Sequence, residues 1–254
     1  MVKLLTSRIV AHEPLASAID RLVLHTDQPL ESLPAQFVRL TFPVARDPYL
    51  PRPFVVFQEE RETLVLVIQV RGRFTQALAA APPGTDLEVS GPHGAVFSLP
   101  PLGRTLFVGG GVGTAVLHRF QDPLAEQHFL LGARSKDSVW FGTCFPKQRT
   151  QIATDDGSLG ERGTLLDLLP GVIETWKPKQ ILASGPAALL AGVARLAREK
   201  GLPSYVSLEE RMACGVGLCL SCVVPLLQAG HRRNARVCHE GPVFPAEDVV
   251  FDAA

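Results

Sequence analysis

Apolar residues in the first hundred positions form short runs that are separated by turn-forming residues. Leu64–Val70 is a run of apolar and β-branched residues, and Phe37–Phe42 and Phe54–Phe57 are shorter runs of the same kind. Prolines and glycines interrupt them, notably in the sequence Gly-Pro-His-Gly at 91–94. Short strands at this spacing predict a small antiparallel β-barrel, and Arg73–Ala81 is expected to form one short helix within it.

The pattern changes after residue 100, where strand-like and helix-like segments alternate. Strands are predicted at Thr105–Val108, His128–Leu131, Gln151–Thr154 and Gln180–Ser184, and helices from the glycine turn to Phe120, at Thr164–Leu169 and at Pro186–Lys200. This alternation predicts a parallel α/β sheet. From Leu208 onward, glycine, cysteine and short apolar pieces predict a loop-rich metal module. We therefore expect an all-β domain over 1–100, an α/β domain over 101–205 and a small module over 206–254.

Composition and charge exclude some classes of function. The chain has 254 residues, 46% of them apolar, and 25 basic residues balance 25 acidic ones. A net charge of zero argues against nucleic acid as a partner, because phosphate backbones attract basic surfaces. The chain contains no apolar run of about 18 residues and no signal-peptide pattern at its start. We therefore expect no membrane segment and a cytoplasmic location.

Four of the five cysteines lie close together near the C-terminus. Cys214, Cys219 and Cys222 follow the pattern Cys-x4-Cys-x2-Cys, and Cys238 follows further along the chain. The first three cysteines have the spacing of plant-type [2Fe–2S] ligands. The intervening glycines allow a loop to wrap around an object wider than one ion. The fifth cysteine, Cys144, is expected to be an inert buried thiol.

A structural zinc site and four unliganded thiols are the alternatives to an iron–sulfur cluster at these cysteines. Structural zinc sites also use four thiolates, but usually as two separated pairs rather than as a trio and a single residue. Four unliganded cysteines are disfavoured by the many glycines around them. The spacing favours the iron–sulfur cluster over both alternatives.

A glycine-rich turn connects the first predicted α/β strand to the helix that follows it. The turn contains Gly109, Gly110, Gly111 and Gly113, and such turns let a backbone approach a pyrophosphate at a helix N-terminus. Thr114 replaces the third glycine of the dinucleotide motif. Asp155 and Asp156 end another predicted strand, where α/β sheets bind ligands, although an ordinary polar turn would look the same. Arg134 could suit either a 2′-phosphate or solvent, so NAD and NADP both stay open.

These features occur in an order that resembles the electron-transfer subunit of dihydroorotate dehydrogenase, a family of ferredoxin-reductase-like flavoproteins. The resemblance covers nearly the whole chain and is carried by segments at 52–54, 91–94, 109–113, 132–137, 155–158 and 184–186. Its most specific segments are Ser-Leu-Glu-Glu-Arg-Met-Ala-Cys at 207–214 and Val-Cys-His-Glu-Gly-Pro-Val-Phe at 237–244.

The resemblance implies FAD in the barrel, NAD(H) in the α/β domain and the cluster near a partner subunit. The segments that match the family's FAD contacts contain Arg52, Pro53, Phe54, Val55, Val67, Ile68, Gln69, Phe74 and Thr75. Val55 stands where the family usually has a hydroxyl residue. Phe74 stands where it usually has glycine, close to the FAD pyrophosphate, and a bulky side chain there would demand a local rearrangement. Ser184 replaces a cysteine common near the nicotinamide.

The family also implies a path for electrons, from NADH to FAD, to the cluster and to the FMN of a catalytic subunit that interconverts dihydroorotate and orotate. The complex would be a heterotetramer that serves pyrimidine biosynthesis. A flavin must lie between a two-electron and a one-electron carrier. No catalytic acid or base is expected in this chain. The alternatives are an NAD(P)H–ferredoxin reductase or hydrogenase diaphorase-type subunit, and a zinc-bound module without redox function.

Overall fold

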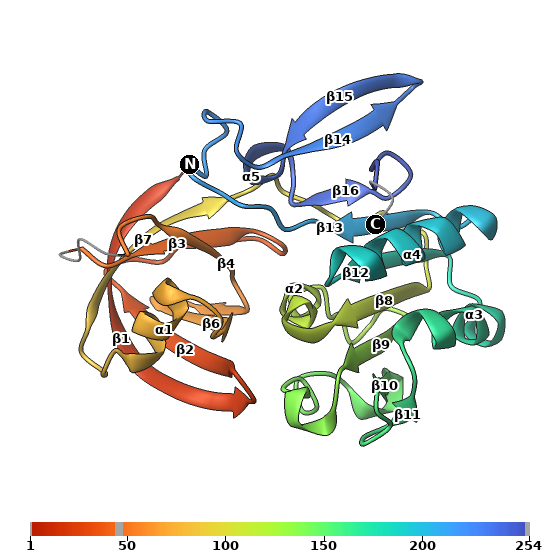
Figure 1. Cartoon of the computed structure of the whole chain (residues 1–254), viewed down its shortest axis with the longest axis horizontal. Helices are drawn as coiled ribbons and strands as arrows, with labels where there is room; N and C mark the ends of the chain where they lie inside the picture. The colour runs from red at the N-terminus through yellow and green to blue at the C-terminus, as the bar shows by residue number, and fades with distance from the viewer. Residues whose placement is uncertain (1, 44–47, 252–254) are drawn as a thin grey trace.

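The first sheet of the molecule is an antiparallel barrel. The computed structural model describes residues 2–43 and 48–251 (Figure 1). Seven strands lie in the order β4-β3-β7-β1-β2-β6-β5. They are β1 (Lys3–Ala16), β2 (Ile19–Thr26), β3 (Phe37–Thr41), β4 (Arg52–Val55), β5 (Gln58–Glu60), β6 (Thr63–Gln69) and β7 (Asp86–His93), with helix α1 (Arg73–Ala80) between the last two. The predicted barrel and its helix are therefore confirmed.

The segment after β4 links the two edges of this sheet. The N–H of Val56 donates to Gln36 O at 3.2 Å, and the N–H of Phe57 donates to Val65 O at 3.0 Å. These two residues leave β3 and pass to β6, which closes the barrel. The prediction of a strand at Phe54–Phe57 is wrong at its end for this reason, since β4 ends at Val55.

The longest strand, β1, is absent from the apolar runs because its buried residues alternate with exposed ones. Leu5, Ser7 and Ile9 face the barrel interior, while the residues between them face outward. Alternation of this kind is what a strand with one buried face requires. Helix α1 covers one end of the interior and buries Phe74 and Leu78 there.

The second sheet is parallel except at one edge, with the order β11-β10-β9-β8-β12-β13-β16. Its strands are β8 (Thr105–Gly110), β9 (Gln127–Ala133), β10 (Thr150–Thr154), β11 (Glu161–Arg162), β12 (Gln180–Ser184), β13 (Ser204–Ser207) and β16 (Val243–Pro245). Its helices are α2 (Thr114–His118), α3 (Leu165–Trp176) and α4 (Ala187–Glu199), with 3-10 turns η1 (Gly111–Gly113), η2 (Lys136–Ser138) and η3 (Lys147–Arg149). The predicted α/β arrangement is confirmed.

Successive residues of β8 show how the helices cover both faces of this sheet. Leu106 and Val108 share a core with α3 and α4. Phe107 points the other way and packs with α2 and with barrel residues such as Phe57 and Val65. Both faces of the strand are buried, which explains its continuous apolar sequence. The barrel and the α/β sheet thus share a core on the α2 side.

Helix α3 extends well beyond its predicted end. The expected helix stopped at Leu169, but α3 continues through Pro170 to Trp176. Thr164 caps its start, and the Thr164 and Asp167 side chains bond each other's backbone N–H groups. Burial of an apolar stripe against the sheet outweighs the hydrogen bond that proline removes. No helix in the described part of the chain is long and apolar enough to cross a membrane.

The C-terminal segment contains more regular structure than the predicted loops. Strands β14 (Val223–Gln228) and β15 (His231–Arg236) form a hairpin, and the short helix α5 (Val237–Glu240) follows. The next strand, β16, then pairs antiparallel with β13 of the second sheet. Cys222, Val224 and Val237 belong to the same core as α3 and α4. Packing is therefore continuous from the α/β sheet into the cysteine-containing segment.

Candidate functional site

The structure brings the four predicted ligand cysteines together. Cys214, Cys219 and Cys222 lie on the loop between β13 and β14, and Cys238 lies in α5. Thiol contacts pair Cys214 with Cys219 and Cys222 with Cys238. The second pair is buried, whereas Cys219 is exposed. The four sulfurs therefore form two pairs at different depths.

Each of the four sulfurs accepts at least one backbone N–H. Cys214 Sγ accepts from the N–H groups of Val216 at 3.5 Å, Leu218 at 3.3 Å and Cys219 at 3.4 Å. Cys219 Sγ accepts from the N–H of Cys214 at 3.5 Å. In the buried pair, Cys222 Sγ accepts from the N–H of Cys238 at 3.4 Å, and Cys238 Sγ accepts from the N–H of Gly217 at 3.2 Å. Donors aimed at sulfur stabilise the thiolate form that binds metal. The loop is therefore suited to anionic sulfur.

Burial and hydrogen bonding act in opposite directions on the pKa values of Cys214 and Cys238. Burial raises the pKa of Cys214, but the N–H groups around its sulfur outweigh this and lower the pKa to about 6. Burial, with the contact to Cys222, raises the pKa of Cys238 to about 12. Deprotonation of Cys238 thus depends on the positive charge of a bound metal.

The paired arrangement fits a two-iron cluster better than a single zinc ion. Within residues 2–43 and 48–251, no group of three or more His, Cys, Asp or Glu side chains is placed to hold one metal ion. Zinc requires four ligands that converge on one point. In a two-iron cluster, each iron can take one pair of thiolates. The structure therefore favours the iron–sulfur interpretation.

Two glycines shape the loop around the sulfurs. Gly215 and Gly217 have φ angles of +68° and +80°, which side chains rarely adopt. A Cβ on Gly215 would overlap the side chain of Arg39, which reaches the loop from strand β3 of the barrel. The Arg39 guanidinium donates to the carbonyls of Cys214 and Ala213. The barrel thus contacts the cysteine loop directly.

Two of the resemblance motifs meet beside this loop. The Ala95 N–H donates to Gly241 O at 2.6 Å, and a Cβ on Gly94 would lie 3.0 Å from Pro242. The Gly-Pro-His-Gly segment of the barrel therefore packs against the Gly-Pro segment that follows Cys238. A side chain on Gly94 would not fit at this contact.

The predicted FAD residues lie around one end of β4, β6 and α1. A cavity of about 110 Å³ is lined by Pro48, Tyr49, Leu50, Arg52 and Arg73. Arg52 comes from β4 and Arg73 from the first turn of α1, and the N-terminal end of a helix also favours an anion. The Thr75 Oγ1 accepts from the N–H groups of Arg71 and Gly72 and holds this turn in place. The donor set fits a pyrophosphate.

The side chain of Phe74 does not face this cavity. Its ring is buried in the barrel core, with centroids 5.4 Å from that of Phe42 and 6.1 Å from that of Phe54. The bulky side chain at this position is therefore accommodated in the barrel core rather than beside the cavity. Its backbone is at the start of α1, while its side chain points inward.

The other predicted FAD residues take different orientations. Val55 and Val67 pack toward the core shared with the α/β sheet, and Ile68 faces the barrel interior. Of residues 67–69, only Gln69 has an exposed side chain. Strand β5 pairs with β6 only over residues 63–65, so one backbone edge of 67–69 is left without a strand partner. At these positions the backbone, rather than most of the side chains, is available to a cofactor.

The glycines of the turn after β8 differ in the space around them: most are closely packed, and one faces open space. A Cβ on Gly109 would lie 2.8 Å from side chains of α2, and one on Gly113 would lie 2.7 Å from the backbone of Gly185. Gly111 differs, because its φ is +58° and a Cβ there would meet no atom within 4 Å. Gly110 packs against the start of α4. Gly111 therefore marks the open position at the helix N-terminus.

The strand order makes this turn the expected place for a nucleotide. Strands β9 and β12 flank β8 on opposite sides, so the chain changes direction across the sheet there. Ligands of α/β sheets bind at such switch points, outside the carboxyl ends of the strands. Ser184 and Gly185 lie at the same edge, directly across from the glycine turn.

Asp155 and Asp156, which follow β10, have different surroundings. Asp156 Oδ1 accepts from the Ser158 N–H at 2.9 Å and from the Ser158 hydroxyl at 2.6 Å, and these bonds lower the pKa of the carboxyl. Asp156 therefore stabilises its own turn. Asp155 is exposed beside it, and both aspartates stay predicted NAD contacts. Arg134 follows the end of β9, and its two interpretations, a 2′-phosphate contact or a solvent-facing residue, both stay open.

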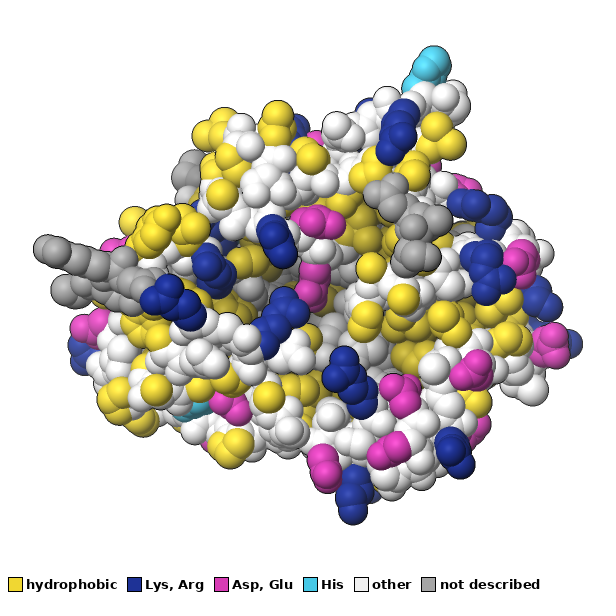
Figure 2. Space-filling view, in the orientation of Figure 1, with side chains coloured by type: hydrophobic (Ala, Val, Ile, Leu, Met, Phe, Trp, Pro, Cys, Tyr) yellow, Lys and Arg dark blue, Asp and Glu magenta, His cyan; other side chains and the backbone are white. Residues whose placement is uncertain are grey.

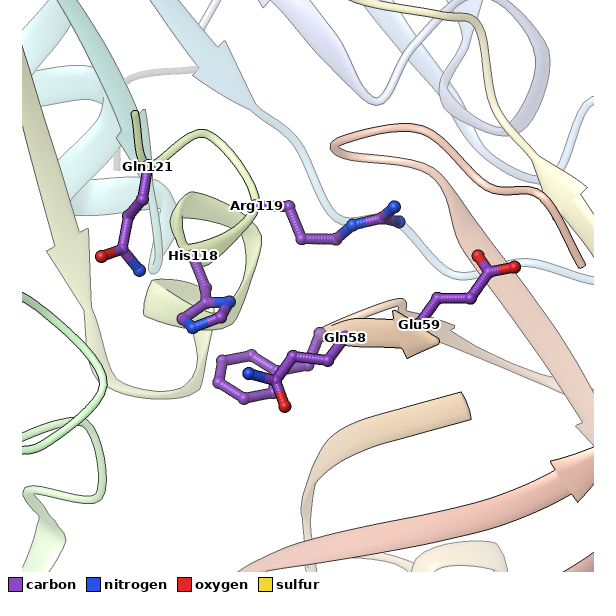
Figure 3. Close-up of a pocket in the computed structure, with 6 residues that line it drawn as sticks. Gln58, Glu59, His118, Arg119 and Gln121 are labelled. Atoms are coloured by element: carbon purple, nitrogen blue, oxygen red, sulfur yellow. The ribbon is translucent and has the colours of Figure 1, made fainter. Parts of the chain in front are cut away.

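A second cavity, of about 410 Å³, is lined by none of the predicted cofactor residues (Figure 3). It is lined by Phe57, Gln58 and Glu59 from the barrel and by His118, Arg119 and Gln121 from the end of α2. Glu59 accepts from the Ser32 hydroxyl and N–H, and Arg119 donates to the same hydroxyl. These polar side chains join the barrel to the α/β sheet.

Sequence reasoning did not identify Arg39, and it gave Gly185 only as part of the resemblance segment at 184–186. Arg39 interrupts the apolar strand Phe37–Thr41, and a charged residue within a buried run was the available signal. Gly185 has a φ of +144°, and its backbone would lie 2.7 Å from a Cβ placed on Gly113. Only the pairing of β8 with β12 brings these two glycines together.

Solved structures identify the class to which this fold belongs. An NADH-dependent reduced ferredoxin–NADP oxidoreductase is 28% identical with a TM-score of 0.84, and the match covers 96% of this chain and 90% of that one. A ferredoxin–NADP⁺ reductase from Neisseria gonorrhoeae, solved with FAD and NADP, shares the fold at 17% identity and a TM-score of 0.64, over 78% and 92% of the two chains. The protein is of the ferredoxin-reductase-like class.

Relatives in sequence define the family within that class. Residues 209–250 match the iron–sulfur cluster binding domain of dihydroorotate dehydrogenase B. The dihydroorotate dehydrogenase B (NAD(+)) electron transfer subunit of Desulforamulus reducens is 36% identical over 230 residues, which are 87% of this chain and 88% of that one. The subunit of the same name from Listeria innocua is 32% identical over 95% and 97% of the two chains. The chain belongs to this family of electron transfer subunits.

Proposed function

We propose that this protein transfers electrons between NAD(H) and the catalytic subunit of a dihydroorotate dehydrogenase. The observation that carries the proposal is the arrangement of Cys214, Cys219, Cys222 and Cys238 as two pairs, each sulfur under a backbone N–H. In this proposal the four thiolates hold a [2Fe–2S] cluster. The arrangement lies beside the barrel, where FAD would bind, because Arg39 reaches the loop from β3.

The bound cofactors supply the redox chemistry, since a flavin can accept the two electrons of a nicotinamide and release them singly to a one-electron cluster. The chain's own part is to position them. Arg52, Arg73 and the start of α1 would hold the FAD pyrophosphate. Gly111 and the edge formed by Ser184 and Gly185 would leave room for NAD(H). Three domains follow from this assignment: residues 1–100 for FAD, 101–205 for NAD and 206–254 for the cluster.

The surface over the cluster loop supports docking of the catalytic subunit there. Leu218 is 82% exposed and Leu220 is 60% exposed, on either side of Cys219. Hydrophobic side chains gather over the upper part of the molecule in the space-filling view, where Figure 1 places this loop (Figure 2). Exposed leucines beside a redox centre suit burial against a partner. We propose that the partner contains FMN and assembles with this chain as a heterotetramer in the cytoplasm.

The experiment is coexpression with a candidate catalytic subunit, followed by purification and assay. The expected complex shows flavin bands and a cluster shoulder, contains acid-labile sulfide and forms orotate with NAD⁺. The variant Cys222→Ser should lose the cluster absorbance and the coupled activity, whereas Cys144→Ser should keep both. A colourless protein that contains zinc would refute the proposal. A red-brown complex without NAD-linked orotate formation would refute the choice of partner.

A second candidate function has one observation in its favour. The NADH-dependent reduced ferredoxin–NADP oxidoreductase matches 96% of this chain with a TM-score of 0.84. A reductase or hydrogenase diaphorase-type subunit would use the same cofactors with another partner. NAD(P)H-dependent reduction of ferredoxin by the purified protein, without any catalytic subunit of the orotate reaction, would favour this candidate.

A further inference from the structure

Arg39 places a positive charge of the barrel against the cysteine loop. It lies in the middle of β3, opposite Pro53 of β4 and Ser90 of β7. Its two terminal nitrogens donate to the carbonyl of Cys214 and, at 2.6 Å, to the carbonyl of Ala213. The side chain lies over Gly215, where a Cβ would come within 2.7 Å of Nε. The contact therefore requires both the arginine and the glycine.

The charge of Arg39 is not neutralised by a carboxylate. In the part of the chain that the structure describes, no Asp or Glu forms an ion pair with it. Arg236 provides a contrast on the other side of the loop: it donates to Gly217 O at 3.1 Å, but Glu240 pairs with it at 3.0 Å. Of these two arginines that contact the loop, only Arg39 has an uncompensated charge.

One donor of Arg39 is left without an acceptor in the protein. The Nε atom is buried and has no hydrogen-bond partner among the described residues. A buried N–H without an acceptor is unfavourable, so an acceptor bound beside the loop would be stabilised there. Because the guanidinium donates to the backbone of Cys214, its charge lies beside a ligand residue of the cluster.

We propose that Arg39 is a positioning residue that raises the reduction potential of the cluster and fixes the cysteine loop to the flavin-binding barrel. The inference rests on the proposed function, because it requires a cluster on this loop. A cluster with four thiolates gains one negative charge on reduction, so a nearby fixed cation stabilises the reduced form more than the oxidised form. The reduction potential of the cluster thus depends on Arg39, which lies in the barrel rather than in the segment that carries the cysteines.

The strand that carries Arg39 also connects the two cofactor sites. Arg39 is the direct neighbour of Pro53 in the register of β3 and β4, and Pro53 belongs to the predicted FAD segment. The strand that contacts the ligand loop is therefore hydrogen-bonded to the strand that carries the predicted FAD residues 52–55.

The test is a redox titration of the purified holoprotein, with the cluster followed by its visible and electron paramagnetic resonance spectra. We expect Arg39→Gln to lower the ratio of reduced to oxidised cluster at least tenfold at a fixed potential, which is about 59 mV for one electron. Arg39→Lys keeps the charge and should remain within about threefold of the wild type, by the same relation. Arg195→Gln removes an exposed charge on α4 and should change nothing.

The outcomes separate this inference from the proposed function. An Arg39→Gln protein with a complete cluster and a wild-type potential would overturn the role of Arg39. A wild-type protein without any cluster would instead overturn the proposed function. If Arg39→Gln does not retain its cluster, Ser90→Asp decides, because a carboxylate opposite Arg39 would neutralise it in place. A lower potential for Ser90→Asp than for Ser90→Asn supports the proposal, and equal potentials overturn it.

Discussion

Replacing Phe74 tests whether this departure from the family serves the barrel or affects the cofactor. The ring is only 3% exposed, and its centroid lies 5.4 Å from that of Phe42 and 6.1 Å from that of Phe54. Truncation of a buried phenylalanine to alanine costs about 3–5 kcal/mol. Each aromatic pair at this separation contributes about 0.5–1.5 kcal/mol of that cost. We therefore expect Phe74→Ala to lower the free energy of unfolding by about 3–5 kcal/mol.

The residue that is usual in the family, glycine, gives the sharper version of this experiment. Phe74→Gly should be about 0.5–1 kcal/mol less stable than Phe74→Ala, because glycine is unfavourable in a helix. Neither variant should bind FAD more tightly, since the ring does not face the predicted pyrophosphate site. The measurements are urea unfolding followed by circular dichroism, and FAD titration of the folded protein.

A double-mutant cycle provides the control. Phe42→Ala, combined with Phe74→Ala, should show a coupling of about 0.5–1.5 kcal/mol, as expected for rings in contact. The reasoning is refuted if Phe74→Gly loses less than about 1 kcal/mol, which is below the range for a buried ring, and binds FAD tenfold more tightly. That pair of results would mean that the ring faces the cofactor.

Three further predictions concern other parts of the molecule. Gly113→Ala should raise the Kd for NADH at least tenfold and leave the flavin spectrum unchanged, because its Cβ would lie 2.7 Å from the backbone of Gly185; Gly171→Ala, at an open helical position, is the matched control, and equal affinities would contradict the assignment. Burial, and then the charge of Arg39, lowers the pKa of His93 to about 4. The unfolded chain binds this proton below about pH 6.5, so stability falls as the pH drops from 6.5 toward 4, by about 1.4 kcal/mol per unit. His93→Gln should lack this loss when urea unfolding is compared at pH 7.5 and 5.5, and an unchanged pH dependence would refute it. Burial raises the pKa of Cys144, so iodoacetamide should label it slowly in the folded protein at pH 8; rapid labelling, detected by mass spectrometry, would show that this thiol is reactive.

The sequence alone determined the features that depend on local order. The spacing of Cys214, Cys219 and Cys222 predicts a loop that wraps a cluster, because ligand spacing is set by the loop itself. The glycine turn after Val108 and the alternation of strands and helices predict the α/β sheet, which the structure contains. Apolar runs identified the strands with two buried faces, but not β1, whose buried residues alternate with polar ones.

The tertiary structure decided what depends on contacts between distant segments. Arg39 and the carbonyl of Cys214 are 175 residues apart in the chain. Their contact exists only because the barrel packs against the C-terminal loop. The direction of the Phe74 ring follows from the way α1 covers the barrel end, and the pairing of the cysteines follows from the position of α5 after the β14–β15 hairpin. Local patterns specify residue type and period, whereas strand order and packing specify which side chains meet.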